Sequence, residues 1–173
     1  RLKNNLLVTT VMSNLGLRVA CDRLGIIHHA SAVGDRNVLE DMQRLGGVLG
    51  GEDSGHMIFL DQHTTGDGTL SSLQLVATML RSGRPLSELA TVMDIFPQRL
   101  VNIDVTKKPP VEDIDGLADA IERVETELEG QGRVLVRYSG TQNMCRVMVE
   151  GPTVELTDRY AEQIADIVRA AIG

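Results

Sequence analysis

One stretch of the sequence combines residue types that suit the binding of an anion: Arg137-Tyr138-Ser139-Gly140-Thr141. The planar guanidinium group of arginine matches the geometry of a phosphate, and a glycine lets backbone N–H groups approach an anion closely. Serine, threonine and glycine are also the usual residues of solvated turns. The stretch is therefore consistent with two interpretations, a phosphate-binding loop and an ordinary turn.

Two alternating runs flank this stretch, from Arg133 to Arg137 and from Cys145 to Glu150. Their alternation predicts two strands that pair as an antiparallel hairpin about the intervening loop. In that hairpin Arg137 lies opposite Arg146, and two like charges that face each other across a strand pair are destabilising. An anion bound between the two arginines would remove this repulsion.

A second group of polar residues occupies the loop from Gly51 to His56, between two short predicted strands. Its glycines permit a tight backbone, so that Glu52 and Ser54 project from the loop. A carboxylate accepts hydrogen bonds and a serine hydroxyl both donates and accepts them, and such groups bind the hydroxyls of sugars. An ordinary polar turn is the alternative interpretation.

Two further pairs of polar residues precede that loop. Asp35 and Arg36 follow a turn and begin a predicted helix, for which Asp35 could serve as the N-cap. His28 and His29 are adjacent in a predicted strand, so their side chains point to opposite faces and are poorly placed to chelate one metal ion. We interpret both histidines as packing or solvent-exposed residues.

The apolar pattern predicts an α/β fold with a mixed sheet and βαβ units in residues 1–96, followed by a small α+β domain in residues 97–173. In the first part, a strand over 5–12 that is apolar on both faces, a helix between Asn14 and Gly25, and a strand over 26–30 form a βαβ unit. The second part predicts an antiparallel sheet with helices on one face. The helical stripes expected to face the core are Leu17, Ala20, Cys21 and Leu24; Val38, Met42 and Leu45; Leu73, Val76, Ala77 and Leu80; Ile114, Leu117, Ile121, Val124 and Leu128; and Leu156, Tyr160, Ile164, Ile167 and Ala171.

The composition argues against several classes of protein. A net charge of −7 and 2% aromatic residues do not suit a general nucleic-acid-binding surface. No apolar run reaches the roughly 18 residues of a membrane span, so we expect a cytoplasmic protein with neither a membrane nor a nucleic-acid partner. Cys21 and Cys145 lack the spacing of a zinc or redox motif and are expected to be reduced and buried. Because an apolar run directly follows Arg1, we also expect the sequence to be a piece of a longer polypeptide.

The polar stretches also carry a resemblance to a known family. Residues 137–142 and 146–151 resemble the C-terminal phosphate-binding loop of the bacterial phosphoglucosamine mutases, in the α-D-phosphohexomutase superfamily, and residues 51–56 resemble their sugar-recognition loop. Residues 1–96 resemble the third domain of these enzymes, and residues 97–173 the fourth. The resemblance implies a phosphate site formed by Arg137, Ser139, Gly140, Thr141 and Arg146. It implies a sugar site formed by Glu52, Ser54, His56, Asp35 and Arg36.

The resemblance further implies an intramolecular phosphotransferase of amino-sugar metabolism, which supplies cell-wall precursors. Such an enzyme interconverts glucosamine 6-phosphate and glucosamine 1-phosphate through a bisphosphorylated sugar, with a phosphoserine and Mg²⁺. The sequence contains neither a Ser-His-Asn run nor an Asp-x-Asp-x-Asp-Arg run, so we expect both groups in missing N-terminal domains. The chain alone should then hold no catalytic residue and no metal ligand, and should be inactive.

The resemblance also bears on partners and on alternatives. The expected partners are a phosphorylated amino sugar and the missing domains, and a homodimer is left open. Two other functions stay open as well: a phosphomannomutase or phosphoglucomutase of the same superfamily, and a non-catalytic module that binds a sugar phosphate.

Overall fold

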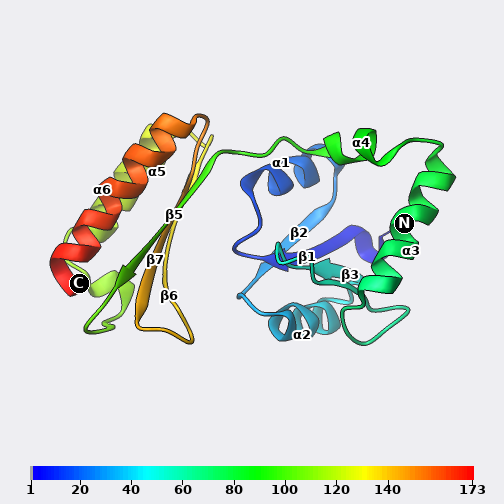
Figure 1. Cartoon of the computed structure of the whole chain (residues 1–173), viewed down its shortest axis with the longest axis horizontal. Coiled ribbons are helices and arrows are strands. Elements are labelled where there is room, and N and C mark those ends of the chain that lie inside the picture. Colours follow the sequence, from blue (N-terminus) through cyan, green and yellow to red (C-terminus); the bar gives the residue numbers. More distant parts are fainter. Residues whose placement is uncertain (1) are drawn as a thin grey trace. The chain divides into compact units, whose positions relative to one another are not determined.

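A computed structural model of the protein describes residues 2–173 (Figure 1). The chain forms two compact units, residues 1–95 and residues 96–173, each with its own sheet. The first sheet has four strands in a mixed arrangement, and the second has three antiparallel strands. The predicted α/β and α+β fold classes are therefore confirmed.

In the first unit the strands lie in the order β2-β1-β3-β4. Strand β1 is parallel to both β2 and β3, whereas β4 is antiparallel to β3, so the predicted βαβ unit is present. The elements are β1 (Leu6–Thr10), α1 (Leu15–Leu24), β2 (Ile27–Ser31), α2 (Asp35–Leu45), β3 (Leu49–Gly51), β4 (Met57–Phe59), α3 (Gly68–Ser82) and α4 (Leu86–Leu89), with 3₁₀ turns at Lys3–Asn5 and Ala90–Val92.

Local signals account for where the first two helices begin and end. Asn14 caps α1, because its Oδ1 accepts a hydrogen bond from the Gly16 N–H at 3.0 Å, and Gly25 ends α1 with a φ of 65°. The role of Asp35 as the N-cap of α2 is wrong. Gly34 occupies that position with a φ of 123°, which favours glycine, and Asp35 is the first helical residue.

The core of the first unit lies between the sheet and α2. Leu6 and Val8 of β1 pack with Val38 and Met42 of α2 and with Ile58 of β4. The inward stripe predicted for α2 is thus confirmed, and one face of the sheet is covered by this helix.

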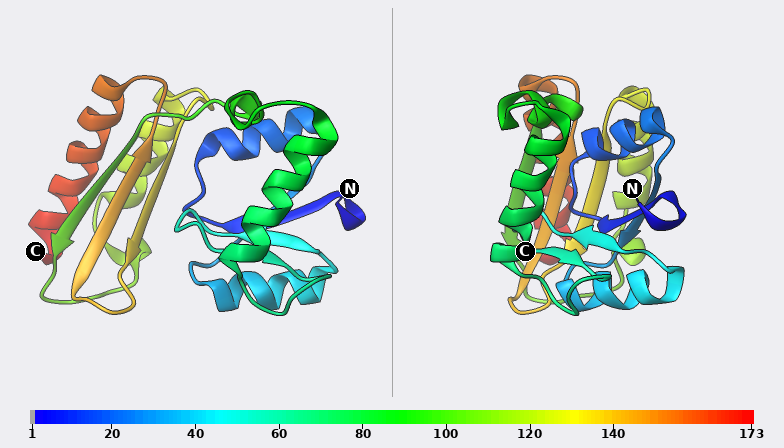
Figure 2. Two further views of the ribbon diagram at one scale, coloured as in Figure 1. Left: turned by 45° about the vertical axis from the view of Figure 1, so that its right-hand side comes forward. Right: turned by 90° about the vertical axis from the view of Figure 1, so that its right-hand side faces the viewer.

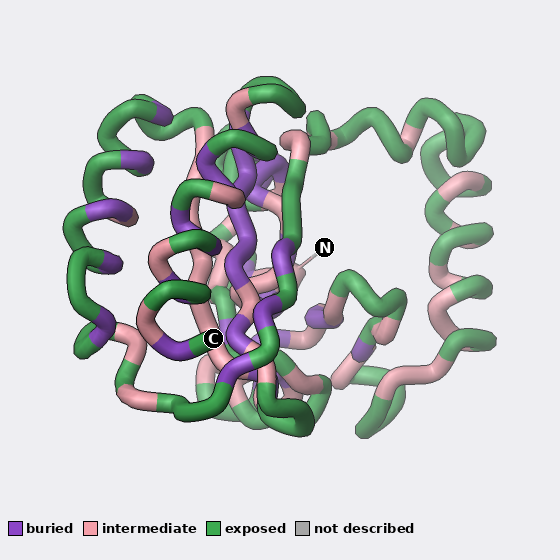
Figure 3. Tube along the Cα trace, turned by 60° about the vertical axis from the view of Figure 1, so that its left-hand side comes forward, coloured by how far each residue is buried: buried purple, intermediate pink, exposed green. Residues whose placement is uncertain are grey.

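The inward stripe predicted for α3 is not buried. Within the described structure α3 has no buried residue, and Leu73, Val76 and Leu80 are 63%, 51% and 79% exposed (Figure 3). Leu24 of α1, also predicted to face the core, is 53% exposed. Periodicity identifies the apolar side of a helix, but it does not say which element covers that side.

In the second unit, α5 and α6 lie on the same side of the sheet (Figure 1, Figure 2). The strand order is β5-β7-β6, and both strand pairs are antiparallel. The residues predicted for the inward stripes of both helices pack in or against one core, which includes Cys145 and Val147 of the central strand. The elements are β5 (Gln98–Asp104), a 3₁₀ turn (Val111–Asp113), α5 (Leu117–Glu127), β6 (Arg133–Tyr138), β7 (Met144–Glu150) and α6 (Val154–Ile172).

Both cysteines behave as predicted. Cys21 and Cys145 are free and buried, and burial raises the pKa of each thiol. None of the helices described in residues 2–173 combines the length and the apolar character needed to cross a membrane.

Candidate functional site

The hairpin of β6 and β7 brings two arginines together. The strands pair so that Arg137 is directly opposite Arg146, as predicted. Cys145 and Val147, the neighbours of Arg146 on β7, point into the core beneath the helices. Because side chains alternate along a strand, both arginines lie on the opposite face of the sheet.

The two guanidinium groups leave hydrogen-bonding capacity unused. The Nε atoms of Arg137 and Arg146 are buried and have no hydrogen-bond partner among the described residues. Their other contacts are long: Arg137 Nη1 donates to the Tyr138 carbonyl at 3.4 Å, and Arg146 Nη2 donates to Gln142 Oε1 at 3.4 Å. Burial, followed by the charge of Arg146, lowers the pKa of Arg137. A bound anion would satisfy both Nε donors and neutralise their charge.

The loop between the two strands presents Ser139, Gly140 and Thr141. The Ser139 N–H donates to the Met144 carbonyl at 2.9 Å, which closes the loop, and Ser139 is only 4% exposed. A Cβ atom added at Gly140 would meet no atom within 4 Å. The Cα of Gly140 therefore borders open space on the side where a side chain would lie.

A third cation, Lys108, contacts this loop and was missed by the sequence reasoning. Its Nζ donates to the carbonyls of Ser139 at 3.3 Å and Gln142 at 2.9 Å, so it ties the two ends of the loop together. The pairing of β5 with β7 is the feature that could have predicted this contact of Lys108. β5 pairs with β7 as far as Asp104 and Met144, which brings the residues after Asp104 to the side of the loop.

In the first unit, two loops meet at Glu52. Glu52 Oε1 accepts a hydrogen bond from the Gly34 N–H at 2.8 Å, which joins the β3–β4 loop to the start of α2. The β3–β4 loop is itself tight, because the Glu52 N–H donates to the His56 carbonyl at 2.9 Å and the Gly55 N–H to the Glu52 carbonyl at 3.0 Å. Among the described residues only Oε1 is engaged, so Oε2 is left to accept from a ligand.

The side chain of His56, at the end of the β3–β4 loop, faces Asp35. His56 Nε2 lies 3.6 Å from Asp35 Oδ2, and it is buried without a hydrogen-bond partner in the described part of the chain. Gly66, from the loop before α3, packs on the imidazole ring, since a Cβ atom there would come within 2.1 Å of Nε2. The structure thus brings Asp35, Glu52 and His56 together, and Gly66 is a supporting residue that the sequence reasoning did not identify.

The remaining predicted sugar-site residues lie at the edge of this group. Arg36 forms an ion pair with Glu40 at 2.8 Å along α2, and its side chain is 87% exposed. Ser54 is exposed in the β3–β4 loop. Only the Nε of Arg36 takes part in this ion pair, and a guanidinium group has five N–H donors, so an anionic ligand could bind Arg36 beside Glu40.

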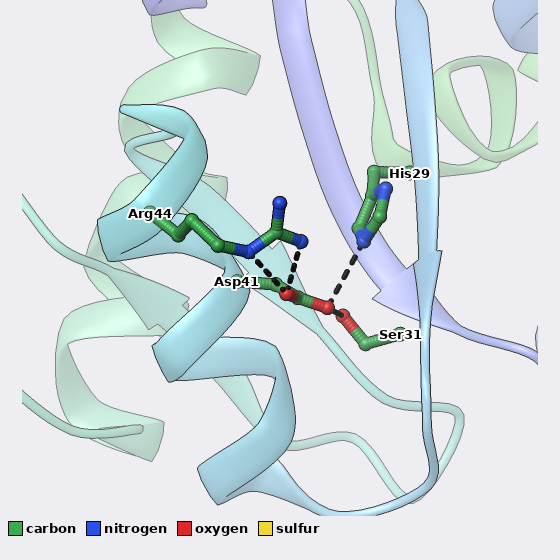
Figure 4. Close-up of polar contacts among 4 residues, drawn as sticks. All are labelled: His29, Ser31, Asp41 and Arg44. Atoms are coloured by element: carbon green, nitrogen blue, oxygen red, sulfur yellow. Dashed lines mark hydrogen bonds and ion pairs between the residues drawn. The ribbon is translucent and has the colours of Figure 1, made fainter.

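A polar network around Asp41 fixes α2 against β2 (Figure 4). Asp41 Oδ2 accepts from Ser31 Oγ at 2.7 Å and lies 2.9 Å from His29 Nε2, and its Oδ1 accepts from Arg44 Nη2 at 2.5 Å. The hydrogen bonds from Ser31, then Arg44 and His29, hold the pKa of Asp41 well below its usual range. Because the network ties α2 to the strand before it, it also fixes the position of Asp35 at the start of the helix.

The two histidines of β2 have different partners, as their opposite orientations predicted. His28 Nε2 lies 2.7 Å from Thr9 Oγ1, whereas His29 contacts Asp41. Across residues 2–173, no group of three or more His, Cys, Asp or Glu side chains is arranged to hold a metal ion.

Models of known protein families match both units. Residues 1–96 match the model for phosphoglucomutase/phosphomannomutase, alpha/beta/alpha domain III, and residues 100–167 match the C-terminal domain of phosphoglucomutase/phosphomannomutase. The chain belongs to the phosphoglucomutase/phosphomannomutase family. The Glu52 loop therefore lies in domain III of this family, and the arginine hairpin lies in its C-terminal domain.

Curated relatives in this family carry a more specific name. The chain is 67% identical over 173 residues to a phosphoglucosamine mutase of Syntrophobacter fumaroxidans, and 55% identical over 173 residues to that of Syntrophus aciditrophicus. Each alignment covers 100% of this chain and 38% of the relative. The chain thus spans about two fifths of the length of these phosphoglucomutase/phosphomannomutase family members.

Solved structures share the fold at low identity. The N-acetylphosphoglucosamine mutase of Aspergillus fumigatus superposes with a TM-score of 0.83 at 20% identity, over 96% of this chain and 39% of that chain. A structure of that enzyme in complex with GlcNAc-6P and magnesium gives a TM-score of 0.82 at 19% identity, over 95% of this chain and 42% of that chain. At these identities the likeness establishes the fold alone.

Proposed function

We propose that this chain is the sugar- and phosphate-binding part of a phosphoglucosamine mutase. The whole enzyme interconverts glucosamine 6-phosphate and glucosamine 1-phosphate through a bisphosphorylated sugar. Identities of 67% and 55% to proteins of that name support the choice of an amino sugar. Phosphomannomutase or phosphoglucomutase activity is the second candidate, because the matching family model carries both names.

The observation that carries the proposal is the pair of buried, unpartnered Nε atoms of Arg137 and Arg146. A mutase that moves a phosphoryl group between two ends of a sugar must hold one phosphate while the other end reacts. In the proposal, both arginines bind the non-reacting phosphate through charge-assisted hydrogen bonds. The hydroxyls of Ser139 and Thr141 and the backbone N–H of Gly140 complete the phosphate site.

The sugar is bound by the residues around Glu52. With Oε1 held by the Gly34 N–H, Oε2 accepts from a sugar hydroxyl, and the carboxylate charge attracts the ammonium group of glucosamine. His56, which faces Asp35, provides a second hydrogen-bonding group, and Ser54 donates from the exposed edge of the loop. Together these groups distinguish an amino sugar from a plain hexose.

We place the Mg²⁺ and the phosphoserine of the reaction outside these residues. Magnesium stabilises charge on a transferring phosphoryl group when it is bound. The residues described here offer no cluster suited to a metal ion, and the A. fumigatus enzyme was solved with GlcNAc-6P and magnesium. In this proposal the part played by this chain is to bind and orient the sugar phosphate.

Assays on the 6-phosphates of glucosamine, glucose and mannose test the proposal. The longer polypeptide that contains these residues should convert glucosamine 6-phosphate most efficiently, and the 173-residue chain should show no turnover with Mg²⁺. A preference for glucose or mannose phosphate would favour the second candidate. Binding without any turnover by the longer polypeptide would indicate a non-catalytic module instead.

A further inference from the structure

Four consecutive backbone N–H groups of the β6–β7 loop make no hydrogen bond within the described structure. They belong to Gly140, Thr141, Gln142 and Asn143, and all four residues are exposed. Successive backbone N–H groups form a concave binding site for an anion when they converge on one point. Whatever sets their direction therefore decides whether this loop can bind a phosphate.

The carbonyl groups of the same loop, in contrast, have partners. Lys108 Nζ donates to the carbonyls of Ser139 at 3.3 Å and Gln142 at 2.9 Å. The Val105 N–H donates to the Asn143 carbonyl at 3.0 Å. The short segment that follows β5 thus engages three carbonyl groups of the loop and none of its four free N–H groups.

The segment that carries Lys108 runs on the helix side of the sheet in the second unit. Just before Lys108, the N–H and the hydroxyl of Thr106 donate to the Ile172 carbonyl, at the end of α6, at 3.0 Å and 3.3 Å. Just after it, Val111 packs against the core that α5 and α6 form with the sheet. The arginine pair of the hairpin lies on the opposite face of the sheet. Lys108 and the two arginines therefore approach the loop from different sides.

The direction of each carbonyl group fixes the direction of the N–H group that follows it. A trans peptide is planar, so its C=O and N–H bonds point in opposite directions. All peptide bonds of the described chain are trans. Because Lys108 binds the carbonyls of Ser139 and Gln142, the N–H groups of Gly140 and Asn143 point away from Lys108. They point away from the helix side, as the arginine pair does.

We propose that Lys108 is a positioning residue of the phosphate site, and that the Asn143 N–H is a second backbone donor there, beside the Gly140 N–H. The proposal rests on the proposed function, because it takes the arginine hairpin as the phosphate site. The role of Lys108 is indirect. Its ammonium group holds two carbonyl oxygens, which would repel an anion, on the far side of the loop, and so directs two N–H groups toward the bound phosphate.

NMR titration of the ¹⁵N-labelled 173-residue chain with inorganic phosphate tests the proposal, with the amide signals of residues 139–143 as the readout. Lys108→Met removes the donor but keeps an unbranched side chain. Lys108→Arg keeps both the charge and N–H donors. Lys107→Met is the matched control, because it removes the same charge from the neighbouring residue, which is exposed and makes no hydrogen bond or ion pair with a described residue.

In the absence of phosphate, Lys108→Met should already shift the amide signals of Gly140 and Asn143, because their peptide groups lose the bond that orients them. Phosphate should then bind roughly 3- to 10-fold more weakly than to the unmodified chain. Lys108→Arg should restore most of this affinity. Lys107→Met should change neither the two amide signals nor the affinity for phosphate.

Unchanged signals of Gly140 and Asn143 in ligand-free Lys108→Met would overturn the proposal, because the lysine would then not orient these peptide groups. An equal loss of phosphate affinity in Lys107→Met would also overturn it, since net charge would explain the effect. Phosphate binding that is as tight in Lys108→Met as in the unmodified chain would refute the role of Lys108 alone. A lack of any response to phosphate in the unmodified chain would instead refute the phosphate site itself, and this role of Lys108 with it.

Discussion

Replacing Arg137 with alanine removes one of the two guanidinium groups that face each other across β6 and β7. Its Nε is buried without a partner among the described residues and its Nη1 makes one bond of 3.4 Å, so both are available to a phosphate. Charge-assisted hydrogen bonds contribute about 1.5–3 kcal/mol each. The loss of one or two such bonds should lower phosphate affinity, and kcat/KM of the whole enzyme, by roughly 10- to 10⁴-fold. We expect the lower part of that range, because Arg146 remains.

The same substitution should leave the free energy of unfolding of the ligand-free chain nearly unchanged. Burial and the charge of Arg146 lower the pKa of Arg137, so the folded protein disfavours its charge. Removing that charge relieves the repulsion across the strand pair and offsets the lost packing of the side chain. What should disappear is the extra stability that a bound phosphate confers on the folded state.

Calorimetric titration with glucosamine 6-phosphate, together with thermal unfolding at increasing phosphate concentration, measures both effects. Arg123→Ala is the matched control, since it removes the same charge from an exposed position on α5. Unchanged phosphate affinity in Arg137→Ala would refute the reasoning. An equal loss in Arg123→Ala would also refute it, because the effect would then be one of net charge.

Three other substitutions test separate parts of the account. Glu52→Gln keeps an acceptor for the sugar but removes the charge, so kcat/KM should fall roughly 5- to 10-fold more for glucosamine 6-phosphate than for glucose 6-phosphate; equal losses would count against ammonium recognition. Lys108→Ala should weaken phosphate binding roughly 3- to 10-fold by freeing the ends of the loop, and calorimetry should show no such loss in the control Lys107→Ala. Asp41→Asn should destabilise the fold at neutral pH. The folded-state pKa of Asp41 is depressed, so its ionised carboxylate stabilises the folded state. This stabilisation is fully present above the unfolded pKa of about 3.9 and is lost as the pH falls through the lower folded-state pKa. The free energy of unfolding measured in urea should therefore differ less between Asp41→Asn and the unmodified chain in acid than at neutral pH. A difference in the free energy of unfolding that does not change with pH would contradict this role of Asp41.

Local patterns predicted the features that depend on neighbours in sequence. The hairpin register follows from two alternating runs about one short loop, so the apposition of Arg137 and Arg146 could be derived without a structure. Asn14 and Gly25 bound α1 because their effects on the backbone are local. The assignment of individual side chains to sugar or phosphate binding stays a prediction.

Features that depend on distant segments were not predictable in the same way. The stripe on α3 was expected to be buried, but periodicity does not identify a covering element, and Leu80 remains 79% exposed. The bond between Glu52 and the Gly34 N–H joins loops 18 residues apart, and Lys108 reaches carbonyls 31 and 34 residues away. These contacts follow from how the strands are ordered in each sheet, which single-sequence periodicity leaves open.

The central claim, that this chain holds a sugar phosphate at the arginine hairpin, is tested most directly by NMR titration of the ¹⁵N-labelled chain with glucosamine 6-phosphate. We expect saturable shifts of the backbone amides from Ser139 to Thr141, because these residues border the proposed phosphate site and the Gly140 N–H is one of its donors. Unphosphorylated glucosamine should leave these amides unmoved, and Arg137→Ala should greatly weaken the response. Amides of residues 139–141 that stay unshifted at saturating glucosamine 6-phosphate, or that respond equally to glucosamine, would contradict the claim.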